Sequence, residues 1–495
     1  MLEAVFAQLR FAASIMFGVR FNLKSLDRLI TSLQETRHEF GTLSHEASEL
    51  LTIPSLDDET RREIQLRRFR TQAVRAARKT VYYAPVFATL GLDPTRLRYE
   101  DIQRVPLTTK TTVRERSDDL IVCDATPYLR SATTGTTGRS TGVCFSSYEM
   151  RTLAALTTIH YLINGQVTNK DIVQNCLSSR SSAGNPGMVH TCERLGALLF
   201  PIGITDPAQA LSLLREQRRI PGKKERVSIL VTYPSYLGQL VEEGLRLGYG
   251  PDDFGLERIM SGGELVTAGL RRRCAALFGP VAFSEGYAMT EILPLGGNLC
   301  NQGHLHYEIS EGLMEVIDPD TGRPAAPGEP GTLVATPFPP YRETTILLRY
   351  DTQDMVRTIA GPLTCSMATM PATTNILGKQ SLCVRHDQGW TFPRDVVEAL
   401  EAVPEVPLPA RYGFWAVPGG VALDVLVREI TPAAYTQIVA SLTAHGVLVQ
   451  ELELTTNRTE IRQPYPLRCD LKESTFASAP PPAHPIRESA TEVRP

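Results

Sequence analysis

The sequence predicts an α/β protein with a large N-terminal domain built on mixed sheets and a small α+β domain at the C-terminus. Three observations predict this fold class. The chain has 495 residues, which is too long for one ordinary hydrophobic core. Between about residues 105 and 380, short β-rich runs alternate with helical runs. Beyond about residue 378, a new pattern of helix, strand and helix begins.

Helices are expected first, in an N-terminal extension over residues 1–75. Leu26, Leu29, Ile30 and Leu33 recur at the spacing of one helix face, and a charged helical segment follows at 57–70.

The first 21 residues, MLEAVFAQLRFAASIMFGVRF, are mostly apolar. Glu3, Gln8, Arg10 and Arg20 interrupt them, so they form neither a signal core nor a stable membrane span of about 20 apolar residues. We expect an amphipathic helix that packs on the body of the protein or on another subunit, for instance in a homodimer. Contact with a membrane surface is the alternative.

The large domain is expected over residues 76–378. Strand character is found in SILVTY (228–233), GTLVATP (331–337) and TILLRY (345–350). Helical character is found in PAQALSLLREQRR (207–219) and AGLRRRCAALF (268–278). A run of turn formers at 318–331 predicts a hairpin-like loop.

The small domain is expected over residues 379–475. It begins with a helix at 395–403, followed by a strand at 422–429 and a second helix at 433–446. The tail, residues 476–495, is rich in proline and small polar residues, and we predict that it is disordered.

Charge and cysteine content narrow the class of protein. The chain has 51 basic and 54 acidic residues, with no Lys/Arg-rich block, so no nucleic-acid partner is expected. The nine cysteines form no CxxC motif and have no regular spacing. This usage favours reduced thiols and a cytoplasmic protein over a disulfide framework.

The segment SATTGTTGRSTG (131–142) is the first candidate for a functional site. A glycine-rich turn lets backbone N–H groups converge on phosphate oxygens, threonine hydroxyls add donors, and Arg139 adds positive charge. The pattern is not the P-loop signature, because Gly135 and Gly138 are too close together and lysine is absent. A surface loop without a ligand is the alternative.

Several further motifs occur in order around this loop. It extends to YLRSATTGTTGRSTGV, an aromatic YYAP segment and PLTTK precede it, and MSGGELV, SEGYAMTE and LLRYDTQDMV follow. Together they resemble the acyl-adenylate-forming (ANL) superfamily, and most of all its phenylacetate-coenzyme A ligase branch. The resemblance covers roughly residues 75–400.

The resemblance implies a role for each motif. Tyr287 would stack on adenine, Asp354 would accept the ribose hydroxyls, and Glu291 would hold Mg²⁺ through a carboxylate oxygen. The remaining residues implied for the nucleotide site are Thr133, Thr134, Gly135, Thr136, Thr137, Gly138, Arg139, Gly263, Glu264, Thr290 and Lys379. Those implied for the acyl pocket are Tyr236, Gly262, Ala288 and Pro294.

Two motifs depart from the family. In the hinge segment GKQSLCVRHDQGWTFP (378–393), the paired aspartates of the family are replaced by Ser381 and Leu382. The catalytic lysine that the family carries near its C-terminus has no clear counterpart, and Arg462 and Lys472 are the candidates for that charge. The change in the hinge segment would affect the rotation by which the family switches from adenylation to thioester formation. Loss of the lysine would slow adenylation more than it would weaken ATP binding.

A metal site is a separate hypothesis. Members of this branch can carry a Cys/His cluster, and CNQGHLH offers Cys300 with either His304 or His306. Cys365 is the third candidate, which leaves a zinc site one ligand short of four. The alternative is a buried thiol with solvated histidines.

The resemblance implies ATP-dependent activation of a small, aromatic carboxylic acid as acyl-AMP, with coenzyme A as acceptor. ATP, Mg²⁺ and coenzyme A are the expected cofactors, and zinc is a further candidate. Transfer to a carrier-protein thiol, or to an amine or hydroxyl in secondary metabolism, is one alternative. A non-catalytic nucleotide-binding protein is another.

Overall fold

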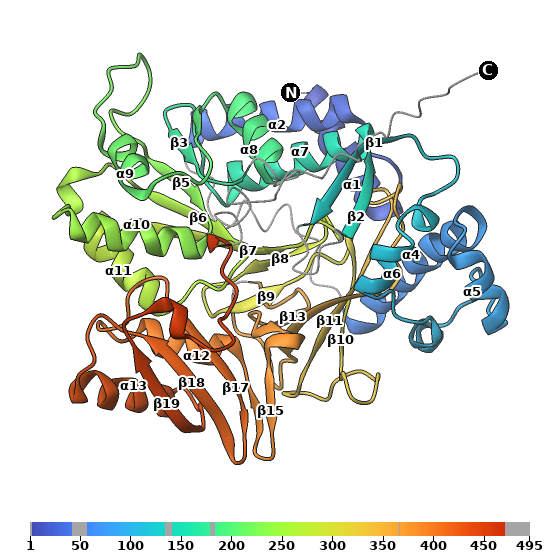
Figure 1. The fold of residues 1–495 in the computed structure, drawn as a ribbon. Coiled ribbons are helices and arrows are strands. Elements are labelled where there is room, and N and C mark those ends of the chain that lie inside the picture. Colours follow the sequence, from blue (N-terminus) through green and yellow to red (C-terminus); the bar gives the residue numbers. More distant parts are fainter. Residues whose placement is uncertain (1, 42–56, 134–140, 179–183, 366, 471–495) are drawn as a thin grey trace, which may run out of the picture.

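A computed structural model describes residues 2–41, 57–133, 141–178, 184–365 and 367–470. Its centre is an eight-stranded mixed sheet in the order β13-β9-β8-β7-β6-β5-β3-β4 (Figure 1). From β7 through β6, β5 and β3 to β4 the neighbouring strands are parallel, whereas β7, β8, β9 and β13 pair antiparallel. The strands are β3 (Ile172–Asn175), β4 (Leu198–Pro201), β5 (Ile229–Thr232), β6 (Arg258–Gly262), β7 (Ala282–Ala288), β8 (Gly296–Leu299), β9 (His304–His306) and β13 (Ala372–Thr374).

Helices cover both faces of this sheet because its parallel strands are apolar on both sides. One core contains residues of α9 (Pro207–Arg215), α10 (Pro234–Arg246) and α11 (Ala268–Phe278). The other contains residues of α2 (Leu23–Phe40), α7 (Ser147–Ile163) and α8 (Gly184–Leu195). The helix α1 (Leu2–Phe17) packs on α2.

A second sheet, in the order β10-β11-β12-β14, lies beside the first (Figure 1). Its strands are β10 (Gly312–Ile317), β11 (Pro330–Pro337), β12 (Tyr350–Arg357) and β14 (Gly378–Lys379). The hairpin of β1 (Pro127–Thr133) and β2 (Thr141–Ser146) and the helices α4 (Asp58–Lys79), α5 (Tyr83–Leu90) and α6 (Lys110–Glu115) share a core with it. The predicted loop at 318–331 thus connects two paired strands.

The C-terminal part has a core of its own. It contains the hairpin β15 (Val384–His386) and β16 (Gly389–Thr391), the helices α12 (Pro393–Glu401) and α13 (Pro432–Ala444), and a sheet of β17 (Tyr412–Val417), β18 (Gly420–Leu426) and β19 (Val449–Thr455). The predicted α/β class with mixed sheets is therefore confirmed. The domain boundaries at 75, 378 and 475 stay predictions, and the tail 476–495 lies outside the described residues.

One strand prediction is wrong. TILLRY was expected to form a strand, but β12 begins only at Tyr350. Ile346, Leu347 and Leu348 are fully buried in the core around α4, so their apolar run reflects burial in an irregular segment. Arg349 has a φ of 47°, which is incompatible with a regular strand.

The small domain docks tightly on α10 and α11. Arg273 of α11 donates to the carbonyl oxygen of Val406 at 2.7 Å, and Glu242 of α10 accepts from the N–H of Leu408 at 2.8 Å. A Cβ on Gly269 would lie 2.2 Å from the carbonyl oxygen of Glu401, so only glycine permits this approach of the two backbones.

Candidate active site

Three predicted nucleotide-site residues meet where the two large sheets adjoin. The Asp354 carboxylate accepts a hydrogen bond from the Tyr287 hydroxyl at 2.8 Å and forms an ion pair with the Lys379 ammonium at 2.8 Å. Asp354 and Lys379 are brought together by strand pairing, because they are opposite each other on β12 and β14. Tyr287 comes from the carboxyl end of β7.

Burial explains why the Tyr287 hydroxyl acts as a donor in this cluster. Asp354 is only 6% exposed. Burial, and after it the negative charge of Asp354, raises the pKa of Tyr287, so its hydroxyl keeps its proton and donates to the carboxylate. The two fixed donors hold the Asp354 carboxylate in one orientation. Each of its two oxygens retains a lone pair that can accept from a further donor.

Glu291 lies in the turn that follows β7 and is 1% exposed. Its Oε1 is 3.5 Å from the hydroxyl of Tyr350, and its Oε2 has no hydrogen-bond partner among the described residues. A buried carboxylate oxygen without a donor is costly, and a hard cation such as Mg²⁺ would satisfy it. The residue thus fits the metal role that the resemblance implies.

Lys110 is a residue of this region to which the sequence analysis gave no role. It begins α6, and the bridge between Thr108 and Tyr350 brings it to the start of β12. Burial and the positive charge of Lys379 lower the pKa of Lys110, while Glu291 and Asp354 oppose that shift. The site therefore contains two ammonium groups and two carboxylates.

The turn Gly262–Gly263–Glu264 begins at the last residue of β6, and β6 is paired with β7 at Gly262 and Gly286. Gly263 has a φ of +82°, a conformation that favours glycine. The Glu264 carboxylate accepts from the backbone N–H of Ser235 at 3.0 Å and from its hydroxyl at 2.6 Å. It also accepts from the backbone N–H of Arg468 at 2.6 Å.

The side chain of Arg468 continues over this turn. Its guanidinium would lie 3.2 Å from a Cβ placed on Gly263, and it is 5.4 Å from the ring centre of Tyr233. The neighbouring Cys469 N–H donates to the Ser235 hydroxyl at 3.2 Å. The end of the small domain thus brings a cation to the Gly-Gly-Glu turn.

Of the two cations predicted from the sequence, Arg462 lies among the described residues. Arg462 donates to both carboxylate oxygens of Asp424, at 2.9 and 2.6 Å, and pairs with Glu453 at 2.9 Å, all within the small domain. The structure therefore does not bring it to Asp354. Lys472 lies outside the described residues.

The phosphate loop is also mostly outside the described residues, which exclude Thr134, Gly135, Thr136, Thr137, Gly138 and Arg139. Thr133 is described as the last residue of β1, and it is paired with Thr141 of β2. β1 and β2 are thus antiparallel neighbours. Thr290 is half-buried directly before Glu291.

The predicted acyl-pocket residues are dispersed. Tyr236 is fully buried in the core of α9 to α11, and its hydroxyl donates to the carbonyl oxygen of Thr205 at 2.7 Å. These contacts account for its burial without a substrate. Ala288 ends β7 and is exposed, Pro294 is half-buried behind a cis peptide bond, and Gly262 ends β6.

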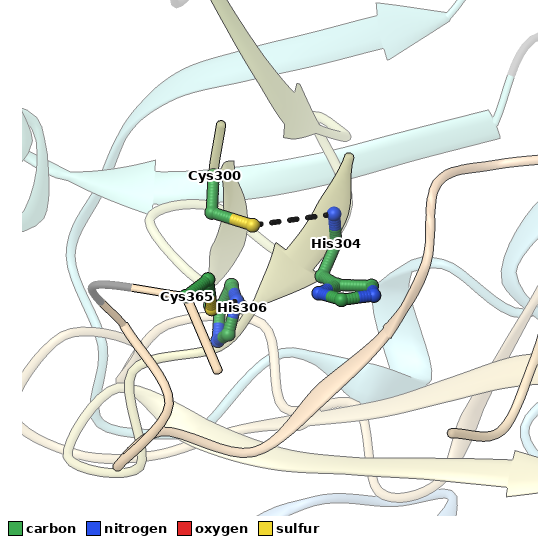
Figure 2. A group of neighbouring side chains, drawn as sticks. All are labelled: Cys300, His304, His306 and Cys365. Atoms are coloured by element: carbon green, nitrogen blue, oxygen red, sulfur yellow. Dashed lines mark hydrogen bonds between the residues drawn. The ribbon is translucent and has the colours of Figure 1, made fainter. Parts of the chain in front are cut away.

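The candidate metal ligands do come together (Figure 2). One ligand atom from each of Cys300, His304, His306 and Cys365 lies within 4.8 Å of the others. Cys365 Sγ is 3.2 Å from His306 Nε2, and buried Nδ1 of His304 has no partner among the described residues. The structure thus adds a fourth candidate ligand, because both histidines of β9 belong to the cluster.

Burial lowers the pKa of His306; a hydrogen bond with the backbone of Met370 opposes this shift, and the proximity of His304 adds to it. The neutral imidazole, which is the form that binds metals, is thereby favoured. Two thiols and two imidazoles in one cluster are the donor set of structural zinc sites.

Comparisons with known proteins identify the family of this chain. A sequence profile described as "AMP-binding enzyme" matches residues 47–336. A phenylacetate-coenzyme A ligase of Thermus thermophilus is 28% identical over 375 residues, which are 72% of this chain and 78% of the relative. One of Escherichia coli is 25% identical over 326 residues, which are 63% and 72%.

Among solved structures, 2-hydroxyisobutyryl-CoA ligase in complex with 2-HIB-AMP is similar in fold. The TM-score is 0.68 at 19% identity, over 86% of this chain and 94% of the other.

The profile covers more than half of the chain, so the protein belongs to the family of AMP-binding enzymes, the adenylate-forming ligases. The assignment to the ANL superfamily and the prediction of an AMP-forming acid–CoA ligase are thereby confirmed at the level of the family. Among the described helices, none combines the length and the apolar character that crossing a bilayer requires.

Proposed function

We propose that this chain activates a small aromatic carboxylic acid with ATP and transfers the acyl group to coenzyme A. The observation that carries the proposal is the Asp354 carboxylate, held by Tyr287 and Lys379 beside the unsatisfied carboxylate of Glu291. An aromatic substrate is supported by the relatives named phenylacetate-coenzyme A ligases.

In the first step, a carboxylate oxygen of the acid attacks the α-phosphorus of ATP, and pyrophosphate leaves. Both reactants are anions, so the protein must align them and offset their charge. Asp354 would accept the ribose hydroxyls, and Glu291 would hold Mg²⁺, which neutralises the phosphate charge when bound. No protein nucleophile is required.

We assign the C-terminal cation of this reaction to Arg468. Its backbone is fixed by Glu264 and Ser235, so that its guanidinium lies over Gly263. Arginine offers a planar fork of donors that suits both carboxylate and phosphate. Arg462 is held by Asp424 instead, and we leave it out of the site.

A matched pair of variants tests this assignment. Arg468→Ala is expected to slow acid-dependent exchange of labelled pyrophosphate into ATP by about 10²–10³-fold, because the cation acts as charge moves in the transition state. Arg462→Ala is expected to keep the exchange within a few-fold and to lower the melting temperature. Slow exchange in Arg462→Ala with normal exchange in Arg468→Ala would reverse the two roles.

We further propose that Cys300, His304, His306 and Cys365 hold a structural zinc ion. Elemental analysis of the purified protein is expected to find about one zinc per chain. Chelation should lower the melting temperature, and Cys365→Ser should reduce the zinc content without a direct effect on nucleotide binding. Cys383→Ser is the control, and zinc absent from the wild type would remove the proposal.

All nine cysteines are free thiols, which supports a reducing compartment, and we place the protein in the cytoplasm.

The acyl acceptor is tested separately with a panel of aryl and alkyl acids. Thioester formation from coenzyme A supports the proposal. Adenylate without thioester would favour a carrier-protein thiol or a small-molecule amine or hydroxyl, and no exchange with any acid would favour a non-catalytic nucleotide-binding protein.

A further inference from the structure

The helix α1 is apolar on both sides. Ala7 and Ser14 are buried on its inner side, where Phe11 and Ile15 pack against the core of α2 and α7. Figure 1 shows this helix at the edge of the large domain opposite the small domain. The large apolar residues on its outer side are exposed: Val5 (46%), Phe6 (62%), Leu9 (60%), Met16 (59%) and Phe17 (67%).

A helix that is apolar all round is normally buried, and a contiguous exposed apolar face marks a binding surface. The family profile begins at residue 47, so α1 lies outside the matched segment. The outer face of α1 is therefore not needed for the adenylate-forming core, and its apolar residues require another explanation.

The spacing on this face is that of a helix–helix seam. Val5, Leu9, Ala12 and Met16 follow one another in steps of four, three and four residues. This is the heptad pattern by which two helices interlock. Phe6 and Phe17 flank the seam.

We propose that the outer face of α1 binds α1 of a second copy of this chain in an antiparallel dimer. With Val5 placed against the partner's Met16, Leu9 lies against the partner's Ala12. Leu9 then fills the space that the small Ala12 side chain leaves, as close packing requires. A parallel dimer would place Ala12 against the partner's Ala12 and leave that layer underfilled.

The charge of the helix favours this occupant over a lipid surface. Glu3 and Arg10 are the only charged residues of α1. Helices that lie on anionic membranes carry several basic residues on the polar face, and α1 has no such face.

The mass of the full-length protein in solution tests the proposal. Wild type is expected to be a dimer by light scattering, and Leu9→Glu/Met16→Glu a monomer, because each interface would bury four carboxylates. Ile430→Glu and Tyr435→Glu are the controls, since these residues are 58% and 46% exposed in the small domain. A monomeric wild type, or a dimer that survives the double variant, overturns the proposal.

Cysteine cross-linking tests the orientation in a Cys123→Ser background, because Cys123 is the exposed native thiol. Val5→Cys/Met16→Cys is expected to form disulfide-linked dimers, whereas either single variant and Leu9→Cys/Met16→Cys are not. Efficient linking of Val5→Cys alone would contradict the antiparallel arrangement. Flotation of a monomeric wild type with phosphatidylglycerol vesicles, lost in Leu9→Glu/Met16→Glu, would assign α1 to the membrane surface.

Adenylation does not depend on this interface. The exchange reaction should therefore persist in the monomeric variant, so a failed dimer proposal is distinguishable from a failed function.

Discussion

At the scale of single residues, the proposed nucleotide site contains one carboxylate, that of Asp354, with two fixed donors. The resemblance implied adenine stacking for Tyr287, and the structure adds a hydrogen bond from its hydroxyl to Asp354. The ring and the hydroxyl thus have separable roles: the ring offers a surface for a base, and the hydroxyl orients the carboxylate that is proposed to receive the ribose.

Tyr287→Phe separates these roles, because it keeps the ring and removes the hydrogen bond. We expect KM for ATP to rise about tenfold, which corresponds to one hydrogen bond to a charged group, while kcat changes only a few-fold. Steady-state measurement of acid-dependent AMP formation provides the check.

The matched control is Tyr307→Phe, whose hydroxyl is 2.7 Å from that of Thr373. It should lower stability and leave KM for ATP unchanged. Equal changes of KM in both variants would show that the Tyr287 hydroxyl has no particular part in the site.

At the scale of elements, α12 and α11 are joined through a buried carboxyl group. Glu401, the last residue of α12, accepts from the Thr267 hydroxyl at 2.5 Å and from the Ala410 N–H at 3.1 Å. Burial raises the pKa of Glu401 from 4.5 to about 7; Thr267, Ala410 and Arg273 oppose the shift, and Glu398 adds to it. Burial therefore favours the protonated carboxyl group, and the two hydrogen bonds offset only part of this effect.

The sign of the pH dependence follows from this raised pKa. As the pH rises, Glu401 loses its proton in the unfolded chain at a lower pH than in the folded protein. Its contribution to the free energy of unfolding is therefore complete below pH 4.5 and is lost as the pH rises through about 7. We expect wild type to lose on the order of 1–3 kcal/mol relative to Glu401→Gln over this interval. Thermal unfolding of both proteins from pH 5 to 8 measures it, and parallel curves would refute the contribution.

Also at the scale of elements, the strand geometry of β9 determines which histidines lie together. His304 and His306 are two residues apart in β9, and side chains at that spacing point to the same side of a strand. From the motif alone, His304 and His306 are alternatives for one ligand position, whereas a strand assignment for HLH predicts both as ligands. The apolar run 346–348 was wrongly expected to be a strand. Apolar residues alone do not distinguish a strand from an irregular buried segment.

At the scale of the whole molecule, the motif residues of the large domain could be placed from the sequence. Tyr287, Asp354 and Lys379 belong to short motifs and meet as the resemblance implied. Arg468 could not be found in this way, because its position depends on how the small domain docks on α10 and α11. Such contacts between distant segments leave no local pattern in the sequence.

The central claim is that Asp354 and its neighbours bind ATP for the activation of a carboxylic acid. Acid-dependent exchange of labelled pyrophosphate into ATP, compared between wild type and Asp354→Ala, tests it most directly. The account predicts exchange by wild type with at least one aryl acid and a loss of about 100-fold or more in the variant, since two hydrogen bonds to a charged group disappear. Exchange that stays within a few-fold of wild type in Asp354→Ala would contradict it.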